Sequence, residues 1–109
     1  MLRLATCVVL ASLVGGAPAA AQDAAKGEAV FAAQKCGLCH SVAGKGNPKG
    51  PLEEPVAKLS AADIRSWITD AKGMTAKTNA TRKPAMKEFT LPKEDVDALV
   101  AYLTSIKKK

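Results

Sequence analysis

Histidine and cysteine are scarce in this chain, which has one histidine and three cysteines among its 109 residues. Two of the cysteines and the histidine lie together at Cys36, Cys39 and His40, and only Cys7 stands apart. A structural zinc ion is held by four such ligands. The chain has no further cysteine or histidine to complete a zinc site beside this cluster.

Other shortages exclude further classes of function. Aromatic residues make up 4% of the chain, and no basic cluster is interleaved with them, so we do not expect nucleic-acid binding. The sequence has no carboxylate pair beside the histidine, no spare nucleophile and no phosphate-cradling loop, which argues against an enzyme. The formal charge of +6 favours electrostatic steering of this protein towards an acidic partner. A lysine-rich surface that is only solvated would give the same net charge.

The N-terminus has the features of an export signal. A short basic start precedes an apolar stretch from Leu4 to Val14, and small residues end it in an A-x-A pattern at Ala21. We therefore expect a signal peptide over residues 1–21, cleaved before Gln22, and a single domain over residues 22–109. The alternative is an uncleaved anchor. Cleavage predicts a periplasmic protein without stable membrane insertion, and it removes Cys7.

The run Cys36-Gly37-Leu38-Cys39-His40 has the spacing of a c-type haem attachment site. Two thiols at this spacing can form thioether bonds to the two vinyl groups of one porphyrin edge, and the following imidazole can then bind the iron. We expect one covalently bound haem c with His40 as an axial ligand. The alternative is a dithiol redox centre, which normally follows a strand in a βαβ context.

Apolar periodicity predicts an all-α fold without repeats or strand alternation. One helix is expected from about Asp23 to the haem motif. A second opens at Ser60 with a capping-box-like start and stops at Gly73. A third follows Pro92. The segments Ser41–Pro55 and Lys72–Leu91 are expected to be loops, and the second is long enough to wrap one face of a haem.

The second axial ligand decides between electron transfer and ligand binding. Met74, Met86 and lysines are the candidates, and we favour Met86, which follows Pro84 in the second loop. A Met/His pair raises the reduction potential of the iron. Met74 lies at the end of the second predicted helix and is expected to pack in the core.

In these features the chain resembles the small class I bacterial cytochromes c. The resemblance covers nearly all of residues 22–109 and rests on an ordered set of features: Gly27 with Phe31, Cys36-x-x-Cys39-His40, Gly50-Pro51, Trp67-Ile68, Met86 and Val100-Ala101-Tyr102-Leu103. It implies a cytochrome c fold, with three to four helices wrapped around a single covalent haem that has His/Met ligation.

The resemblance also implies roles for individual residues. Gly27 and Phe31 should meet the last helix near Tyr102. The Pro51 carbonyl should accept a hydrogen bond from the His40 imidazole. Trp67, Ile68 and Arg82 should form the haem environment. Trp67 and Arg82 are both candidates to bind a haem propionate.

Two positions depart from the family pattern. Leu52-Glu53-Glu54 follows Gly50-Pro51 where Asn-Leu is frequent, and Asp70-Ala71-Lys72 stands where a proline often ends the second helix. Both departures concern the path of the loops around the haem edge.

The sequence as a whole predicts an exported, monomeric one-electron carrier that docks on redox proteins through an acidic patch of the partner. A haem enzyme or gas-binding cytochrome with an open sixth position is the first alternative, and an exported dithiol oxidoreductase is the second.

Overall fold

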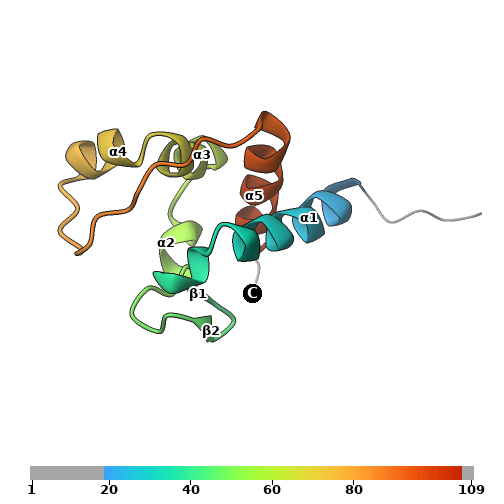
Figure 1. Cartoon of the computed structure of the whole chain (residues 1–109), viewed down its shortest axis with the longest axis horizontal. Helices are drawn as coiled ribbons and strands as arrows, with labels where there is room; N and C mark the ends of the chain where they lie inside the picture. Colours follow the sequence, from blue (N-terminus) through green and yellow to red (C-terminus); the bar gives the residue numbers. More distant parts are fainter. Residues whose placement is uncertain (1–18, 107–109) are drawn as a thin grey trace, which may run out of the picture.

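The computed structural model describes residues 19–106 and shows a mainly helical chain (Figure 1). The prediction of an all-α fold is confirmed, with one very short hairpin added. No helix within residues 19–106 combines the length and the apolar character needed to cross a membrane. The elements in chain order are α1 (Ala19–Ala33), the 3-10 turn η1 (Cys36–Leu38), β1 (Ser41–Val42), β2 (Lys45–Gly46), α2 (Glu53–Ala57), α3 (Ala61–Thr69), α4 (Ala71–Thr78) and α5 (Lys93–Ile106).

The first and last helices cross and pack against each other (Figure 1). At the crossing, a Cβ atom on Gly27 would collide with the main-chain carbonyl of Ala98 and with Cβ of Tyr102. The ring of Phe31 lies edge-on to that of Tyr102, with 5.6 Å between the ring centroids and 69° between the planes. The predicted meeting of Gly27 and Phe31 with the last helix is confirmed.

The core lies between α5 and the two helices α2 and α3. Apolar residues of α5 supply most of it, and Val30 and Phe31 of α1 pack against it while remaining partly exposed. Pro92 precedes α5, and its carbonyl accepts the amide N–H of Val96 at 3.1 Å, as expected for a proline at a helix start. The buried cluster consists of Val56, Ile64, Ile68, Val96, Leu99, Val100, Leu103 and Ile106.

The capping box predicted at Ser60 is confirmed. The Ser60 Oγ atom accepts from the Asp63 amide at 3.1 Å, and Asp63 Oδ2 accepts from the Ser60 amide at 3.2 Å. The predicted end at Gly73 is wrong. The helix breaks at Asp70, whose φ of −141° and ψ of 51° leave the helical region. Its carboxylate then accepts from the Gly73 amide at 3.2 Å and so caps a new helix, α4.

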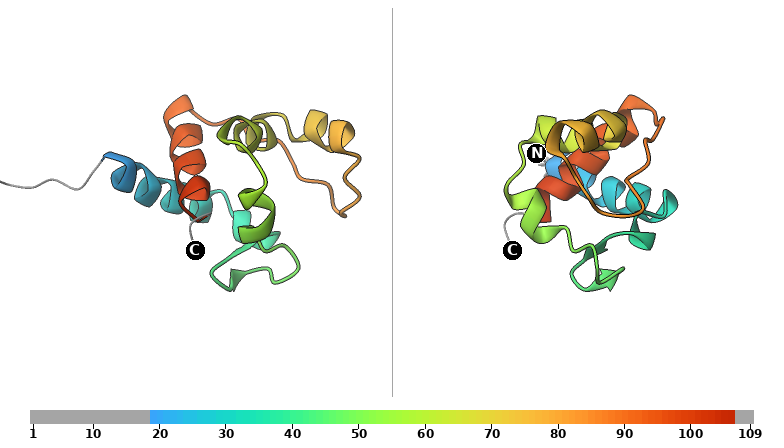
Figure 2. Two further views of the ribbon diagram at one scale, coloured as in Figure 1. Left: turned by 180° about the vertical axis from the view of Figure 1, so that it is seen from behind. Right: turned by 90° about the vertical axis from the view of Figure 1, so that its left-hand side faces the viewer.

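The long loop predicted over Lys72–Leu91 is therefore only partly a loop. Its first part is α4, which ends at Asn79 in the left-handed conformation with φ of 54°. Residues 80–92 contain no helix or strand and return alongside α4 and α3 towards α5 (Figure 2). The predicted ligand Met86 lies in this irregular part.

The loop predicted over Ser41–Pro55 also contains regular structure. Strands β1 and β2 pair antiparallel, with Ser41 opposite Gly46 and Val42 opposite Lys45. Ala43 and Gly44 have φ of 52° and 78° and form the tight turn between the strands. The loop ends where α2 starts at Glu53.

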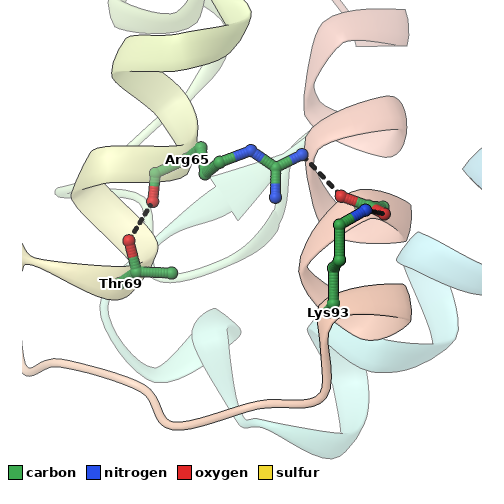
Figure 3. A network of polar contacts seen from close by, with 4 residues as sticks. Arg65, Thr69 and Lys93 are labelled. Atoms are coloured by element: carbon green, nitrogen blue, oxygen red, sulfur yellow. Dashed lines mark hydrogen bonds and ion pairs between the residues drawn. The ribbon is translucent and has the colours of Figure 1, made fainter.

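One surface ion pair, Arg65–Asp97, joins α3 to α5, and a second, Lys93–Asp97, lies within α5 (Figure 3). Arg65 Nη2 donates to Asp97 Oδ1 at 2.6 Å, and Lys93 Nζ donates to Asp97 Oδ2 at 2.9 Å. Both hydrogen bonds lower the pKa of Asp97, that from Lys93 being the larger cause. Asp97 thus links the start of the last helix to α3.

Candidate haem site

The two cysteines and the histidine of the motif lie on one tight turn. Helix α1 ends at Ala33, and Lys35 takes the left-handed conformation with φ of 58°, which redirects the chain into η1. The carbonyl of Cys36 accepts the amides of Cys39 at 3.2 Å and His40 at 3.0 Å. This turn therefore brings the three motif side chains into one short region of surface.

Asn47, which lies outside the motifs of the sequence, forms hydrogen bonds to this turn. Its side-chain Nδ2 donates to the Leu38 carbonyl at 3.0 Å. Its amide N–H is within 3.0 Å of the carbonyls of both Gly37 and His40. The β hairpin that delivers Asn47 is thereby fixed against the haem motif.

The His40 imidazole is oriented by the main chain of the same hairpin loop. Its Nδ1 lies 3.3 Å from the Gly50 carbonyl, which also accepts the Ser41 amide at 2.9 Å. A proton on Nδ1 makes this contact a hydrogen bond and leaves the lone pair on Nε2. The ring then offers Nε2 for metal binding, and the hydrogen bond from Nδ1 to the Gly50 carbonyl fixes the orientation of the ring.

The prediction that the Pro51 carbonyl accepts this bond is wrong, because the acceptor is the carbonyl of the preceding residue, Gly50. Ser41 and Pro51 form an isolated parallel bridge, in which the Gly50 carbonyl accepts the Ser41 amide and the Ser41 carbonyl accepts the Leu52 amide at 3.0 Å. This backbone pairing directs the carbonyl before Pro51, rather than its own, to the imidazole. Pro51 itself is exposed.

The environment sets the protonation of the motif. Burial lowers the pKa of His40, and the nearby Arg82 guanidinium lowers it further, while the hydrogen bond to Gly50 opposes both. Burial raises the pKa of the Cys36 thiol, and the charge of Lys87 partly opposes this. A neutral imidazole is the form that binds a metal.

The segment that contains Met86 reaches the motif through the Arg82 side chain. Arg82 Nη2 donates to the Cys39 carbonyl, and Arg82 Nη1 lies 3.4 Å from His40 Nδ1. Lys87 is near enough for its charge to affect Cys36. The fold therefore brings the Met86 segment to the haem motif from more than 40 positions along the chain.

The two candidate methionines differ in their surroundings. Met74 is buried, with 8% of its surface exposed, in agreement with a packing role. Met86 is only half-buried and lines a hollow of about 430 Å³ between α4 and the returning segment, together with Thr75, Ala76 and Ala85 among others. Met86 thus keeps an accessible thioether.

The other predicted contacts of the haem are placed on α3. Ile68 is buried in the core cluster, and Trp67 beside it is half-buried. Ile68 also accepts the Phe89 amide through its carbonyl at 3.1 Å, which ties the Met86 segment to α3. Their contact with a haem stays a prediction.

The donor set fits a c-type haem. Cys36 and Cys39 are free thiols on one turn, and His40 presents a neutral imidazole whose Nδ1 is engaged. Within residues 19–106, no group of three or more His, Cys, Asp and Glu side chains could hold a bare metal ion.

Comparisons with known proteins agree with this geometry. A model of the family described as Cytochrome c matches residues 24–107. The chain is 31% identical over 91 residues to "Cytochrome c oxidase subunit 2" of Alkalihalophilus pseudofirmus (strain ATCC BAA-2126 / JCM 17055 / OF4), a match that covers 75% of this chain but only 25% of the relative. No solved structure matches the chain. The chain belongs to the cytochrome c family.

Proposed function

We propose that this protein is an exported one-electron carrier that holds a single haem c covalently at Cys36 and Cys39. Membership of the cytochrome c family implies haem c and haem-based electron transfer in general. The observation that supports the finer proposal is the haem motif on one tight turn, with His40 Nδ1 directed to the Gly50 carbonyl and the Met86 segment joined to the motif through Arg82.

The bound haem supplies an iron that takes up and releases one electron. The protein's residues set its environment. Cys36 and Cys39 would hold the haem through thioether bonds, His40 would bind the iron through Nε2, and Met86 would supply a thioether as the second ligand. A thioether favours the reduced iron, so the Met/His pair raises the reduction potential. Two fixed axial ligands change little between the two oxidation states, which suits rapid electron exchange.

Spectroscopy of the purified protein tests this proposal. We expect a pigment that resists acid-acetone extraction and the near-infrared band of Met-ligated ferric haem. The reduced protein should not bind carbon monoxide tightly, because Met86 occupies the sixth position. Tight binding without the near-infrared band would instead favour the haem enzyme or gas-binding alternative. A colourless protein would contradict both.

Export is the second part of the proposal. It is supported by the sequence of residues 1–21, most of which lies outside the described residues. Fractionation of expressing bacteria should place the haem protein in the periplasm, and mass spectrometry should give a chain that begins at Gln22. A mass that includes residues 1–21 in a membrane fraction would show an uncleaved anchor instead.

The partner in this proposal is a redox protein with an acidic surface. Leu38, between the two motif cysteines, is 71% exposed. It borders a hollow of about 350 Å³ whose lining contains Lys35 and Lys45 and no acidic residue. An apolar centre with lysines around it is complementary to an acidic patch with an apolar centre. The name of the relative, "Cytochrome c oxidase subunit 2", suggests an oxidase as one class of candidate partner.

Charge reversal tests this surface. A Lys35→Glu/Lys45→Glu variant should be oxidised more slowly by ferricyanide, an anionic reagent, and the difference should shrink at high ionic strength. A Lys58→Glu/Lys77→Glu variant has the same change in net charge at other sites and should lose less rate. Equal losses in the two variants would show that net charge alone controls the reaction.

A further inference from the structure

Arg82 makes the contact that joins the Met86 segment to the haem motif. Its Nη2 donates to the carbonyl of Cys39, and its Nη1 approaches Nδ1 of His40 to 3.4 Å. Among the side-chain hydrogen bonds of residues 19–106, no other residue of segment 80–92 reaches the motif. The charge of Lys87 lowers the pKa of the Cys36 thiol, but no hydrogen bond joins the two side chains.

The two contacts at His40 Nδ1 need opposite protonation of the ring. Donation from Nδ1 to the Gly50 carbonyl requires a proton on Nδ1, whereas donation from Arg82 to Nδ1 requires its lone pair. When Nε2 binds a metal, the proton of the neutral imidazole lies on Nδ1. The bond to Gly50 is then kept, and the Cys39 carbonyl is the acceptor that remains for Arg82.

Gly50 provides the space that the guanidinium occupies. A Cβ atom at this position would lie 2.5 Å from Nη1 and 2.7 Å from Nη2 of Arg82, and it would also collide with the Cys39 carbonyl. The absence of a side chain at Gly50 therefore lets the guanidinium, the Cys39 carbonyl and the His40 ring lie together.

The other end of the Met86 segment is held as well. The Phe89 amide donates to the Ile68 carbonyl at 3.1 Å, and Glu88 Oε1 accepts the Lys72 amide at 3.3 Å. Met86 lies between these bonds and Arg82. The segment is thus fixed to α3 and α4 on one side of Met86 and to the haem motif on the other.

We propose that Arg82 is a positioning residue for the sixth iron ligand: by binding the Cys39 carbonyl it holds the Met86 thioether in place. This inference rests on the proposed function, since it needs Met86 as the ligand. It differs from the role implied by the family resemblance, in which Arg82 is one of two candidates to bind a haem propionate. A tether controls how readily Met86 leaves the iron, whereas a charge near a propionate controls mainly the potential.

Imidazole binding to the ferric holoprotein tests the tether, because imidazole must displace Met86. Arg82→Gln should bind imidazole about tenfold more tightly, since a hydrogen bond from a charged donor contributes about 1.5 kcal/mol. Its near-infrared Met band should weaken while the far-ultraviolet circular dichroism stays unchanged. Lys83→Gln, which removes the neighbouring charge without the contact, should match the wild type.

Arg82→Lys is the second variant, and it allows the tether to be tested if Arg82→Gln attaches haem poorly. It keeps the charge and one donor but loses the fork of the guanidinium, so we expect intermediate imidazole affinity. A lowered reduction potential in Arg82→Gln with unchanged imidazole affinity would overturn the tether and indicate a charge effect on the haem. Unchanged affinity in both variants would also overturn it.

The two proposals fail in different ways. If the wild-type protein contains haem c but lacks the Met band, Met86 is not the ligand that the proposed function requires, and the role proposed for Arg82 is wrong as well. If the wild-type protein has the Met band and the Arg82 variants bind imidazole as it does, only the tether is wrong.

Discussion

His40 shows how one side chain can be predicted while its partner is not. The haem motif predicts His40 as an iron ligand because a histidine directly after two cysteines at this spacing is chemically specific. Its acceptor is a main-chain carbonyl, and every residue has one. Only the pairing of Ser41 with Pro51 decides that Gly50, and not Pro51, faces the ring.

At the same scale, Met86 and Met74 can be separated by substitution. Met86→Ala should lower the reduction potential and allow imidazole or carbon monoxide to bind at least tenfold more tightly, because the iron loses its thioether. Redox titration and ligand titration measure these effects. Met74→Ala is the control. It should keep the ligation and lose about 2 kcal/mol of unfolding free energy, because its side chain is buried.

Ligand loss in Met74→Ala but not in Met86→Ala would reverse the assignment. The half-exposed position of Met86 beside α4 makes the prediction specific. A thioether that only filled the core would be buried, as that of Met74 is.

Among the elements, the crossing of α1 and α5 depends on the closest approach at Gly27. Gly27→Ala should lower the unfolding free energy by about 1–2 kcal/mol, although alanine favours a helix, because the new methyl meets the Ala98 carbonyl and a backbone cannot move aside easily. Chemical denaturation of the holoprotein measures this. Ala29→Leu, on an exposed position of α1, should leave the stability nearly unchanged.

The ion pairs of Asp97 make the link between α3 and α5 sensitive to pH. The folded-state pKa of Asp97 lies below its ordinary value of 3.8 because Lys93 and Arg65 donate to the carboxylate. Their contribution to stability is therefore complete above about pH 4–5 and is lost as the pH falls through the lowered folded pKa. It is small, because the carboxylate is 41% exposed and screened by salt.

Thermal unfolding of Asp97→Asn against the wild type tests this link. The variant should melt slightly lower at pH 7, and the difference should disappear in strongly acidic solution. Asp23→Asn, an exposed carboxylate on α1, should show no such difference. A difference in melting temperature between Asp97→Asn and the wild type that increases as the pH falls would contradict the stabilising role of the Asp97 ion pairs.

The starts of α3 and α5 are more predictable from the sequence than the break between α3 and α4. The capping box of Ser60 and the proline before α5 are local signals, and both are found. The break between α3 and α4 is also local, since it depends on Asp70 as a cap. It was missed because Gly73 is the more familiar stop signal, whereas here Gly73 lies in the first turn of α4.

For the whole molecule, the core is small. Among residues 19–106, no large side chain is completely buried, so few apolar contacts would remain without a cofactor. Cys36→Ser/Cys39→Ser should therefore lose the pigment on acid-acetone extraction and much of its cooperative unfolding, as followed by circular dichroism. Leu38→Ser keeps both thiols and should retain haem and stability. A fully folded, colourless double variant would show that the polypeptide core is sufficient.

The sequence alone determined the cofactor class, the helical fold and the family resemblance, because each depends on short spacing or on periodicity along the chain. It did not determine which atoms face His40, that Asn47 holds the motif, or that Arg82 reaches the Cys39 carbonyl. These contacts join segments that are distant in sequence. Their pairing depends on the path of the backbone and on space such as that left by Gly50, which exist only once the helices have packed.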